Sequence, residues 1–198
     1  MTSDQIYIYP TDTVWGIGCD MYSEVGFKEI ARIKNTTDNK PLSILFTDID
    51  QVLKSFSFPQ KITKEWLEYF FSQESTLGVP TSWAKMEVPV WAHQNSEYVS
   101  LRCLSSEPLK SLYKKIGNPF FTTSLNLQGE SPIQTEEDAK KFCARFCPNA
   151  IRVEGKNILM SGNSSTMIFI DNKLNFVVKR EGQKLKELII HLNKLSEP

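Results

Sequence analysis

"MIFIDNKLNFVVKR", Met167 to Arg180, contains two apolar runs separated by a short polar segment. Residues 167–171 and 176–180 are rich in β-branched and aromatic side chains, which favour strands, whereas "NKLN" between them is typical of a turn. Two such runs joined by so few residues predict a β-hairpin. Because a hairpin pairs its strands antiparallel, the sheet that contains it is not expected to be purely parallel.

Upstream of this hairpin, helices and strands alternate. Thr135 followed by "EED" resembles a capping box, which predicts a helix that runs to about Phe146 and stops at Pro148. Further upstream, the patterns predict a strand, a short helix and a strand at residues 98–102, 108–116 and 119–126, the last of which ends in hydroxyl residues.

The N-terminal half shows the same alternation. A strand is expected at residues 6–10, with "TDTVWGIGCD" after it as a loop, and residues 24–34 carry apolar side chains at helical spacing. The remaining expectations are a strand at 42–46, a helix at 62–71, an irregular segment with short extended pieces at 76–91 and a last helix bearing Leu185, Leu188, Ile189 and Leu192.

These elements indicate the fold class. Interleaved helices and strands together with one hairpin predict an α/β protein with a twisted, open, mixed sheet flanked by helices. The chain has 198 residues, which suffices for one well-buried core and is short for two. Residues 1–198 are therefore expected to form a single domain.

The charge of the chain is balanced, with 23 basic and 23 acidic residues. No net field draws such a protein to nucleic acid or to a membrane, so an anion site would have to be local. "MTSDQIYIYP" lacks a charged leader followed by an apolar stretch, and no apolar run is long enough to span a bilayer. We expect a soluble, cytoplasmic protein with no membrane partner.

Several common site chemistries lack their signatures. Four cysteines and two histidines show no paired spacing of metal ligands, so no resident metal site is expected. The P-loop pattern is absent, Gly16 and Gly18 lack the third glycine of the dinucleotide fingerprint, and no G-x-S-x-G elbow occurs. Ordinary nucleotide-binding folds and serine hydrolases are disfavoured.

Two lysines flank the loop before the strand expected at 42–46. Lys34 ends the predicted helix, and Lys40 stands directly before Pro41. A lysine is a movable point charge that can hold a phosphate oxygen. A lysine can equally complete a helix C-terminus, or lie solvated in a loop. On charge alone the second interpretation is favoured, and both stay open.

Hydroxyl and amide side chains also gather at the ends of predicted strands. Thr11 and Thr13 follow the strand at 6–10, where they could bind a ligand or form a polar turn. Ser124 and Asn126 are two residues apart, a spacing that points both side chains to one face of a strand end. A turn or cap would explain only one of this second pair.

The motifs taken together resemble a known family. The segments "YPTDTVWGIGCD", "IKNTTDNKPL", "TTSLN" and "SSTMIFID" with "VVKREG" are similar, in order and spacing, to the YrdC-like family of threonylcarbamoyl-adenylate synthases, which supply the tRNA modification t6A. The resemblance extends from about Ile6 to Gly182. Its most specific parts are P-T-D-T-V followed by aromatic-G-x-G, and the S-x-N motif.

This resemblance implies a YrdC-like fold and a nucleotidyltransferase that uses L-threonine, bicarbonate and ATP, with Mg²⁺, and releases pyrophosphate. A tRNA or a tRNA-modifying complex is the implied downstream partner. The implied threonine contacts are Thr13, Arg102, Thr122 and Ser165. The implied nucleotide contacts are Lys34, Thr36, Lys40, Ser124, Asn126 and Arg180, of which Lys34, Lys40, Ser124 and Asn126 are also the implied catalytic residues.

One motif departs from the family pattern. The family's K-x-R is Lys34-Asn35-Thr36 here, so a neutral hydroxyl replaces a guanidinium. The chain is then either a divergent synthase in which Arg32 or Lys40 supplies the missing charge, or a catalytically weakened module that binds nucleotide or RNA. We favour the divergent synthase.

Overall fold

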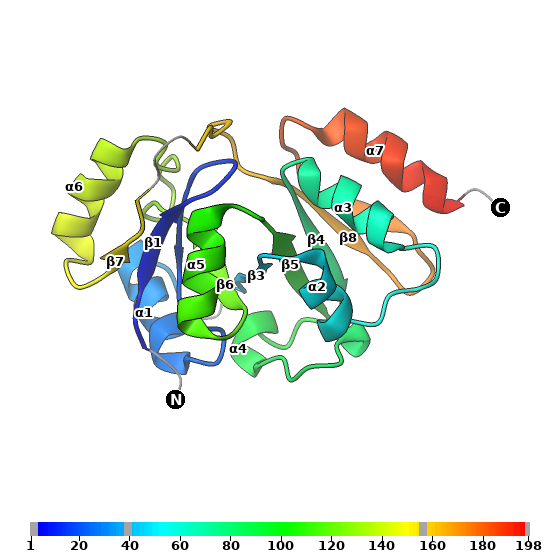
Figure 1. Cartoon of the computed structure of the whole chain (residues 1–198), viewed down its shortest axis with the longest axis horizontal. Helices are drawn as coiled ribbons and strands as arrows, with labels where there is room; N and C mark the ends of the chain where they lie inside the picture. The colour runs from blue at the N-terminus through cyan, green and yellow to red at the C-terminus, as the bar shows by residue number, and fades with distance from the viewer. Residues whose placement is uncertain (1–3, 38–40, 155–157, 197–198) are drawn as a thin grey trace.

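The computed structural model describes residues 4–37, 41–154 and 158–196. Its strands form one nine-stranded sheet in the order β7-β1-β2-β6-β3-β5-β4-β8-β9 (Figure 1). The strands are β1 Tyr7–Pro10, β2 Trp15–Gly18, β3 Ser43–Phe46, β4 Ser75–Pro80, β5 Tyr98–Cys103, β6 Phe120–Ser124, β7 Ile151–Arg152, β8 Thr166–Ile170 and β9 Phe176–Arg180.

Helices flank this sheet, as the sequence predicts. They are α1 Glu24–Lys34, α2 Ile49–Ser55, α3 Lys64–Ser72, α4 Val90–His93, α5 Glu107–Ile116, α6 Glu136–Phe146 and α7 Leu185–Asn193, with short 3₁₀ turns η1 Thr81–Trp83 and η2 Lys194–Ser196. Figure 1 shows α6 beside β7 at one end of the molecule, and α3 and α7 near β4 and β8 at the other. The predicted α/β class with an open mixed sheet is confirmed.

The hairpin at the end of the chain is confirmed as β8 and β9, which pair antiparallel. Its turn is held by the carboxylate of Asp171, whose Oδ1 accepts from the backbone N–H groups of Lys173 (2.8 Å) and Asn175 (2.9 Å). β8 pairs in parallel with β4 on its other side. The sheet is therefore mixed here, and further antiparallel pairs such as β1–β2 and β4–β5 add to this character.

Two apolar clusters hold the helices to the sheet. The larger one contains side chains of α1, α2, α3, α6 and α7 together with most of the strands. The smaller one seats Leu109 and Leu112 of α5 against Tyr7, Leu45 and Phe120 on β1, β3 and β6. Because these clusters cover the middle and flanks of the sheet, the ends of the strands are left to form a polar site.

Two segments contain more regular structure than the sequence predicts, one expected as a loop and one as mostly irregular chain with short extended pieces. "WGIG" at 15–18 is strand β2, and residues 75–80 form the buried strand β4 between β5 and β8. Pro80 and Pro89 favoured irregular chain in the second segment, since proline interrupts strands. Glycines permit close packing in both strands: a Cβ on Gly18 would lie 2.0 Å from the carbonyl oxygen of Phe121, and one on Gly78 would lie 2.1 Å from the ring of Phe169.

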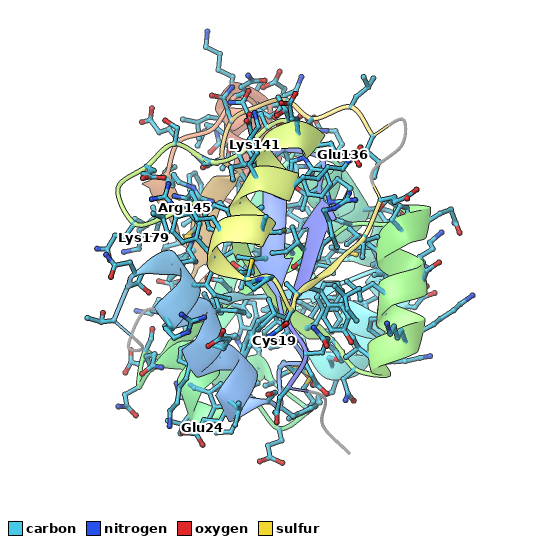
Figure 2. All side chains as sticks on the ribbon, turned by 90° about the vertical axis from the view of Figure 1, so that its left-hand side faces the viewer. Cys19, Glu24, Glu136, Lys141, Arg145 and Lys179 are labelled. Atoms are coloured by element: carbon cyan, nitrogen blue, oxygen red, sulfur yellow. The ribbon has the colours of Figure 1, made fainter. Side chains whose placement is uncertain are left out.

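Charged side chains of both signs share the outer surface. Figure 2 shows Glu136, Lys141 and Arg145 on α6, and Glu24 at the start of α1. Within the described residues, no helix is long and apolar enough to cross a bilayer.

Candidate functional site

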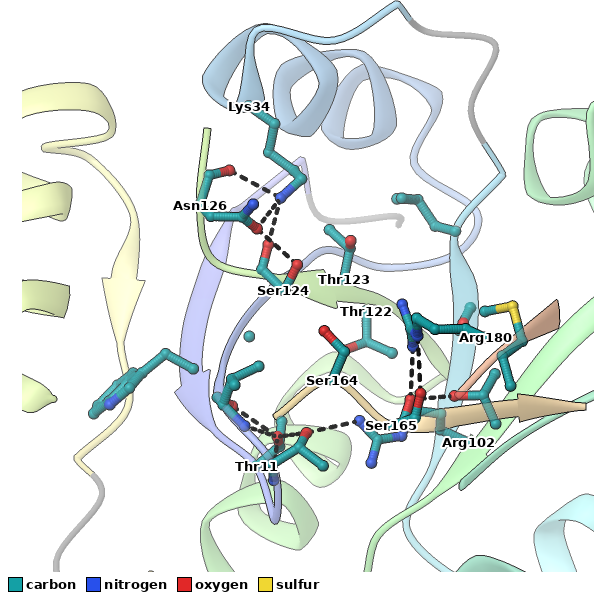
Figure 3. Close-up of a pocket in the computed structure, with 18 of the residues that line it drawn as sticks. Thr11, Lys34, Arg102, Thr122, Thr123, Ser124, Asn126, Ser164, Ser165 and Arg180 are labelled. Carbon is teal, nitrogen blue, oxygen red and sulfur yellow. Dashed lines mark hydrogen bonds between the residues drawn. The ribbon is translucent and has the colours of Figure 1, made fainter. Parts of the chain in front are cut away.

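One pocket gathers side chains that are distant in the sequence (Figure 3). Its cavity measures about 210 Å³. Nine of the ten predicted site residues line it: Thr13, Lys34, Thr36, Arg102, Thr122, Ser124, Asn126, Ser165 and Arg180. The tenth, Lys40, lies outside the described residues. The fold therefore brings the predicted residues to one place, while their individual roles stay predictions.

Strand order explains why these residues meet. β6 lies between β2 and β3, so Ser124 pairs with Gly16 and Thr122 pairs with Ser43. β5 follows β3 in the sheet and carries Arg102. The β1–β2 turn, the end of α1 and the segment entering β8 then close around these strand ends.

The pocket is positively charged although the chain as a whole is neutral. Lys34, Arg102 and Arg180 line it, and no Asp or Glu is among the lining residues that the structure describes. Cations concentrated in a concave site attract anionic ligands much more strongly than the mixed charges of the outer surface. The balanced charge of the chain requires any anion site to be local, and this pocket is a local cluster of positive charge.

The ammonium group of Lys34 is buried and engaged. Its Nζ donates to the backbone oxygens of Ser124 (2.5 Å) and Asn126 (2.9 Å) and to Oδ1 of Asn126 (2.9 Å). Lys34 is the last residue of α1, which Asn35 closes in the left-handed conformation. Lys34 therefore ties α1 to the end of β6, a contact that neither interpretation of the sequence anticipates.

The S-x-N motif forms a fixed turn around this lysine. The Ser124 hydroxyl donates to Oδ1 of Asn126 at 2.7 Å. The Asn126 amide nitrogen donates to the carbonyls of Leu127 (2.9 Å) and Glu130 (2.8 Å). Both polar side chains line the pocket, as their spacing predicts, and they also hold the chain that leaves β6.

Arg102 is the most deeply set arginine of the pocket, with 7% of its surface exposed. Its Nη2 donates to Oδ1 of Asp12 at 2.6 Å, and its Nη1 lies 3.4 Å from the hydroxyl of Thr13. Its buried Nε has no hydrogen-bond partner among the described residues. An unpaired buried donor is costly, so this guanidinium is suited to an acceptor on a ligand.

Arg180 is held at the same end of the pocket. Its Nε and Nη2 donate to the backbone oxygen and the hydroxyl of Ser165, each at 2.8 Å. Burial, and then the positive charge of Arg102, lower the pKa of Arg180 from its usual value. Two arginines therefore share one part of the site, where an anion would relieve their repulsion.

Three further residues, which are not among the ten predicted site residues, lie beside them. The hydroxyl of Thr76 lies 2.8 Å from that of Ser165, and the hydroxyl of Thr11 lies 3.0 Å from that of Thr13. Thr76 was missed because its strand was expected to be irregular. Asp12 stands between two selected threonines, but nothing in the local sequence connects it with Arg102, 90 positions away.

The expected compensation by Arg32 for the missing arginine is not found in the geometry. Arg32 forms two hydrogen bonds of 2.7 Å with the carboxylate of Glu29, and 65% of its side chain is exposed. It does not line the pocket. Helical spacing explains this: Lys34 faces the pocket, and a residue two positions earlier points elsewhere.

Metal ligands are sparse in this site. In residues 4–37, 41–154 and 158–196, no three His, Cys, Asp or Glu side chains form a group that could hold a metal ion. Mg²⁺ prefers oxygen ligands, commonly one or two carboxylates together with phosphates and waters. Because the described lining offers no carboxylate, the protein residues do not fit a resident Mg²⁺ site, and positive charge comes from side chains.

Comparison with known proteins gives a consistent family. A family model, Sua5_yciO_yrdC, described as "Telomere recombination", matches residues 1–182. The threonylcarbamoyl-AMP synthase of Hydrogenovibrio crunogenus is 27% identical over 167 residues, covering 83% of this chain and 86% of that protein. The enzyme of the same name from Wigglesworthia glossinidia brevipalpis is 24% identical over 185 residues, covering 92% and 90%.

Solved structures share the fold. P. abyssi Sua5, solved in complex with L-threonine, superposes with a TM-score of 0.78 at 21% identity, over 95% of this chain and 54% of that one. E. coli YciO superposes with a TM-score of 0.73 at 21% identity, over 91% of this chain and 84% of that one. This chain therefore spans about half the length of the Sua5 chain.

Proposed function

Because the chain belongs to the Sua5/YciO/YrdC family, we propose that it is an L-threonylcarbamoyladenylate synthase. In this role it is a nucleotidyltransferase that joins L-threonine, bicarbonate and ATP and releases pyrophosphate. The observation that carries the proposal is the convergence of nine predicted site residues, three of them cations, on one pocket. The names of the sequence relatives support the same reaction.

Arg102 is the group that we assign to the threonine carboxylate. Its planar guanidinium suits a carboxylate, and its buried Nε is available for a further acceptor. Thr13, Thr122 and Ser165 surround this end of the cavity with hydroxyl groups that suit the amine and the hydroxyl of the amino acid. The carboxylate also offsets the repulsion between Arg102 and Arg180.

Two bond-forming steps then take place in the pocket. The neutral amine of threonine attacks the carbon of bicarbonate, and loss of water leaves a carbamate. A carbamate oxygen next attacks the α-phosphorus of ATP while the bond to the pyrophosphate oxygen breaks. Negative charge builds on the phosphoryl oxygens and the leaving group, and loss of one preplaced donor of this kind typically costs about 3 kcal/mol.

The cavity size suggests how the substrates divide the space. At about 210 Å³ it is smaller than pockets that bury most of a drug-sized ligand, which measure roughly 300–1,000 Å³. We assign the enclosed part to threonine, the carbamate and the reacting phosphate, with the rest of ATP at the open mouth. Mg²⁺ then enters with the ATP phosphates and is not held beforehand by protein carboxylates.

The test is a reaction mixture of the protein with ATP, Mg²⁺, L-threonine and labelled bicarbonate. We expect pyrophosphate release that depends on threonine, and label that appears in a threonylcarbamoyl-AMP product. Alanine or glycine in place of threonine serves as the matched control. Pyrophosphate release that is absent, or independent of threonine, would contradict the proposal.

A catalytically weakened binding module is the second candidate, and Thr36 favours it, because a neutral hydroxyl occupies the position of the family's arginine. Such a module would bind ATP or RNA and release no pyrophosphate. Binding of RNA would weaken steeply as salt is raised. The same reaction mixture, together with ATP and RNA titrations at two salt concentrations, separates the two candidates.

The proposed product is a reactive mixed anhydride that must be passed to an acceptor. A tRNA or a tRNA-modifying complex is the partner that this role calls for, and the cytoplasm is the proposed location. Transfer of label from the product to tRNA, with and without the candidate partner, tests this step.

A further inference from the structure

Asp12 makes the shortest contact to the pocket arginines but is not among the pocket-lining residues that the structure describes. Its Oδ1 accepts from Nη2 of Arg102 at 2.6 Å, and 28% of its side chain is exposed, against 9% for that of Arg102. The carboxylate therefore contacts the guanidinium without lining the cavity.

The hydrogen bonds around Thr13 complete the support of Arg102. The hydroxyl of Thr11 donates to the carbonyl of Val14 at 2.7 Å, which leaves its oxygen to accept from the hydroxyl of Thr13 at 3.0 Å. The oxygen of Thr13 then faces Nη1 of Arg102 as an acceptor. Both terminal nitrogens of Arg102 are thus directed by the turn that contains Asp12, and Nε stays without a partner among the described residues.

This turn is itself anchored from behind. The backbone carbonyls of Asp12 and Thr13 accept from the N–H groups of Ser161 (3.0 Å) and Gly162 (2.8 Å). The side chain of Gln134 donates to the carbonyl of Gly162 at 2.8 Å. Asp12 therefore has little freedom to follow Arg102 if the arginine rotates, and the ion pair fixes the guanidinium plane.

A second arginine makes this support necessary. Arg180 lies close enough for the charge of Arg102 to act on it, and Arg102 is buried whereas part of Arg180 reaches solvent. Two like charges in a poorly hydrated site repel each other. Among the described residues, Asp12 is the one acidic residue that forms an ion pair with Arg102, and none forms an ion pair with Arg180. It is placed to balance one of the two charges without entering the cavity.

We propose that Asp12 is the positioning residue for substrate recognition, orienting the guanidinium of Arg102 toward the carboxylate of the amino acid. This inference rests on the proposed function and adds a specificity role within it. The amino acid and ATP should then respond differently to the loss of the Asp12 charge. The orientation of Arg102 matters for a planar carboxylate, whereas a polyphosphate responds mainly to total positive charge.

Asp12→Asn is the variant that tests this role, because it keeps an acceptor and removes the charge. We expect the affinity for L-threonine, measured by calorimetry, to fall about tenfold or more, as is typical when a residue that orients a ligating group is lost. The affinity for ATP should change less than about threefold, since the pocket cations remain. Threoninamide, which lacks the carboxylate, should bind Asp12→Asn and wild type with similar, weak affinity.

Glu136→Gln is the matched control. Glu136 forms a 2.9 Å ion pair with Arg152 and does not line the pocket. Figure 2 shows Glu136 on α6. This variant should keep the wild-type preference for threonine over threoninamide. Asp12→Glu restores the negative charge and is expected to recover part of the preference for threonine over threoninamide. If Asp12→Asn folds poorly, Asp12→Glu is the variant that tests the role of Asp12.

Three results would overturn the inference. Asp12→Asn could bind threonine as tightly as wild type, or lose threonine and ATP affinity equally, as a general loss of structure would cause. Asp12→Glu could bind threonine no better than Asp12→Asn. A wild-type protein that neither binds threonine nor releases pyrophosphate is a different outcome, because it removes the proposed function itself.

Discussion

The two ends of the pocket carry the same sign of charge but are built differently. At one end, the Lys34 ammonium donates to three oxygens of the chain leaving β6. At the other end, Arg102 keeps a buried donor without a partner among the described residues and lies near a second arginine. The Lys34 end is therefore stabilised by the fold, and the Arg102 end is the one that we propose to bind a ligand.

This difference shows that a lining cation is not automatically a ligand contact. A buried charge is tolerated only when protein groups or a ligand compensate it. For Lys34, protein oxygens already provide compensation, so its removal should affect stability as well as activity. For Arg102, part of the compensation is expected from the substrate, so its removal should affect activity most.

The largest expected effect is that of Arg102→Met on catalysis. We expect kcat/KM for threonine-dependent pyrophosphate release to fall by at least about 100-fold, or roughly 3 kcal/mol of transition-state stabilisation. The free energy of unfolding should change much less, because the remaining Asp12 carboxylate is partly hydrated. Steady-state kinetics and urea unfolding measure the two quantities.

Arg152→Met is the control for this substitution, since it removes an arginine from an ion pair outside the pocket. It should leave kcat/KM near the wild-type value. An Arg102→Met protein that keeps wild-type kinetics would remove the distinction between the two ends.

Lys34→Met, unlike Arg102→Met, should lower the free energy of unfolding as well as the activity. Three acceptors at the end of β6 lose their donor. A single hydrogen bond to a charged group contributes a net stabilisation of roughly 1.5–3 kcal/mol. We expect the free energy of unfolding to fall by about 3 kcal/mol and Tm to fall by about 6–12 °C for a domain of this size. Calorimetry and urea unfolding measure both.

The matched control is Lys28→Met, on the same helix. Lys28 forms an exposed pair with Glu24, and such pairs contribute little. If Lys34→Met unfolds like wild type but is inactive, then Lys34 acts as Arg102 does, and the comparison of the two ends is wrong.

The sequence predicted the membership of the pocket better than its internal contacts. Motif order placed Thr13, Ser124 and Arg180 at strand ends, and the sheet brings those ends together. Hydrogen bonds such as that from Lys34 to the end of β6 join positions about 90 residues apart, and no local pattern encodes them. The Asp12–Arg102 pair escaped prediction for the same reason.

The elements divide in a similar way. The helix at 24–34 was predicted with its observed ends because its apolar spacing is a local signal. β2 was expected as a loop and β4 as mostly irregular chain because of its proline, whereas the close contacts of their glycines with the carbonyl of Phe121 and the ring of Phe169 exist only in the folded chain. Tertiary contacts thus overrode local propensity at these two strands.

Gly182→Ala tests the Arg102 end through its backbone. A Cβ at this position would lie 2.7 Å from the backbone nitrogen of Thr166 and 2.9 Å from the carbonyl oxygen of Ser164. Backbone atoms cannot yield as a flexible side chain does, so the segment holding Ser165 must shift, at a cost of about 1–3 kcal/mol. Thermal melting and kcat/KM should both decrease.

Gly117→Ala separates this effect from ordinary glycine strain. Gly117 has a φ of 84° with open space around its Cβ position, so alanine there should cost about 1–2 kcal/mol without affecting the pocket. Equal losses of activity in both variants would show that the backbone near Ser165 does not matter to the Arg102 end.

Thr36→Arg tests whether the Lys34 end can be made into a ligand contact. Thr36 lines the pocket and is half-buried. An arginine there would add one positive charge near the proposed position of the ATP phosphates. We expect the KM for ATP to fall about three- to tenfold, or roughly 1 kcal/mol, with pyrophosphate release unchanged or raised. Thr37→Arg is the control, because Thr37 does not line this pocket, and it should lower the KM for ATP less. A raised KM for ATP would contradict the assigned phosphate position.

The smallest effect is expected from pH, and it should arise outside both ends of the pocket. His191 of α7 stacks on Trp66, and its Nε2 lies 3.0 Å from the carbonyl oxygen of that residue. Burial lowers the pKa of His191 below its usual 6.5, so the unfolded chain binds more protons than the folded protein at mildly acidic pH. Stability should be complete above about pH 6.5 and decline as pH falls below it. Urea unfolding between about pH 5 and 7.5 measures this decline, which His191→Gln should reduce. A wild-type stability that rises as pH falls through this range would show that a different group controls it.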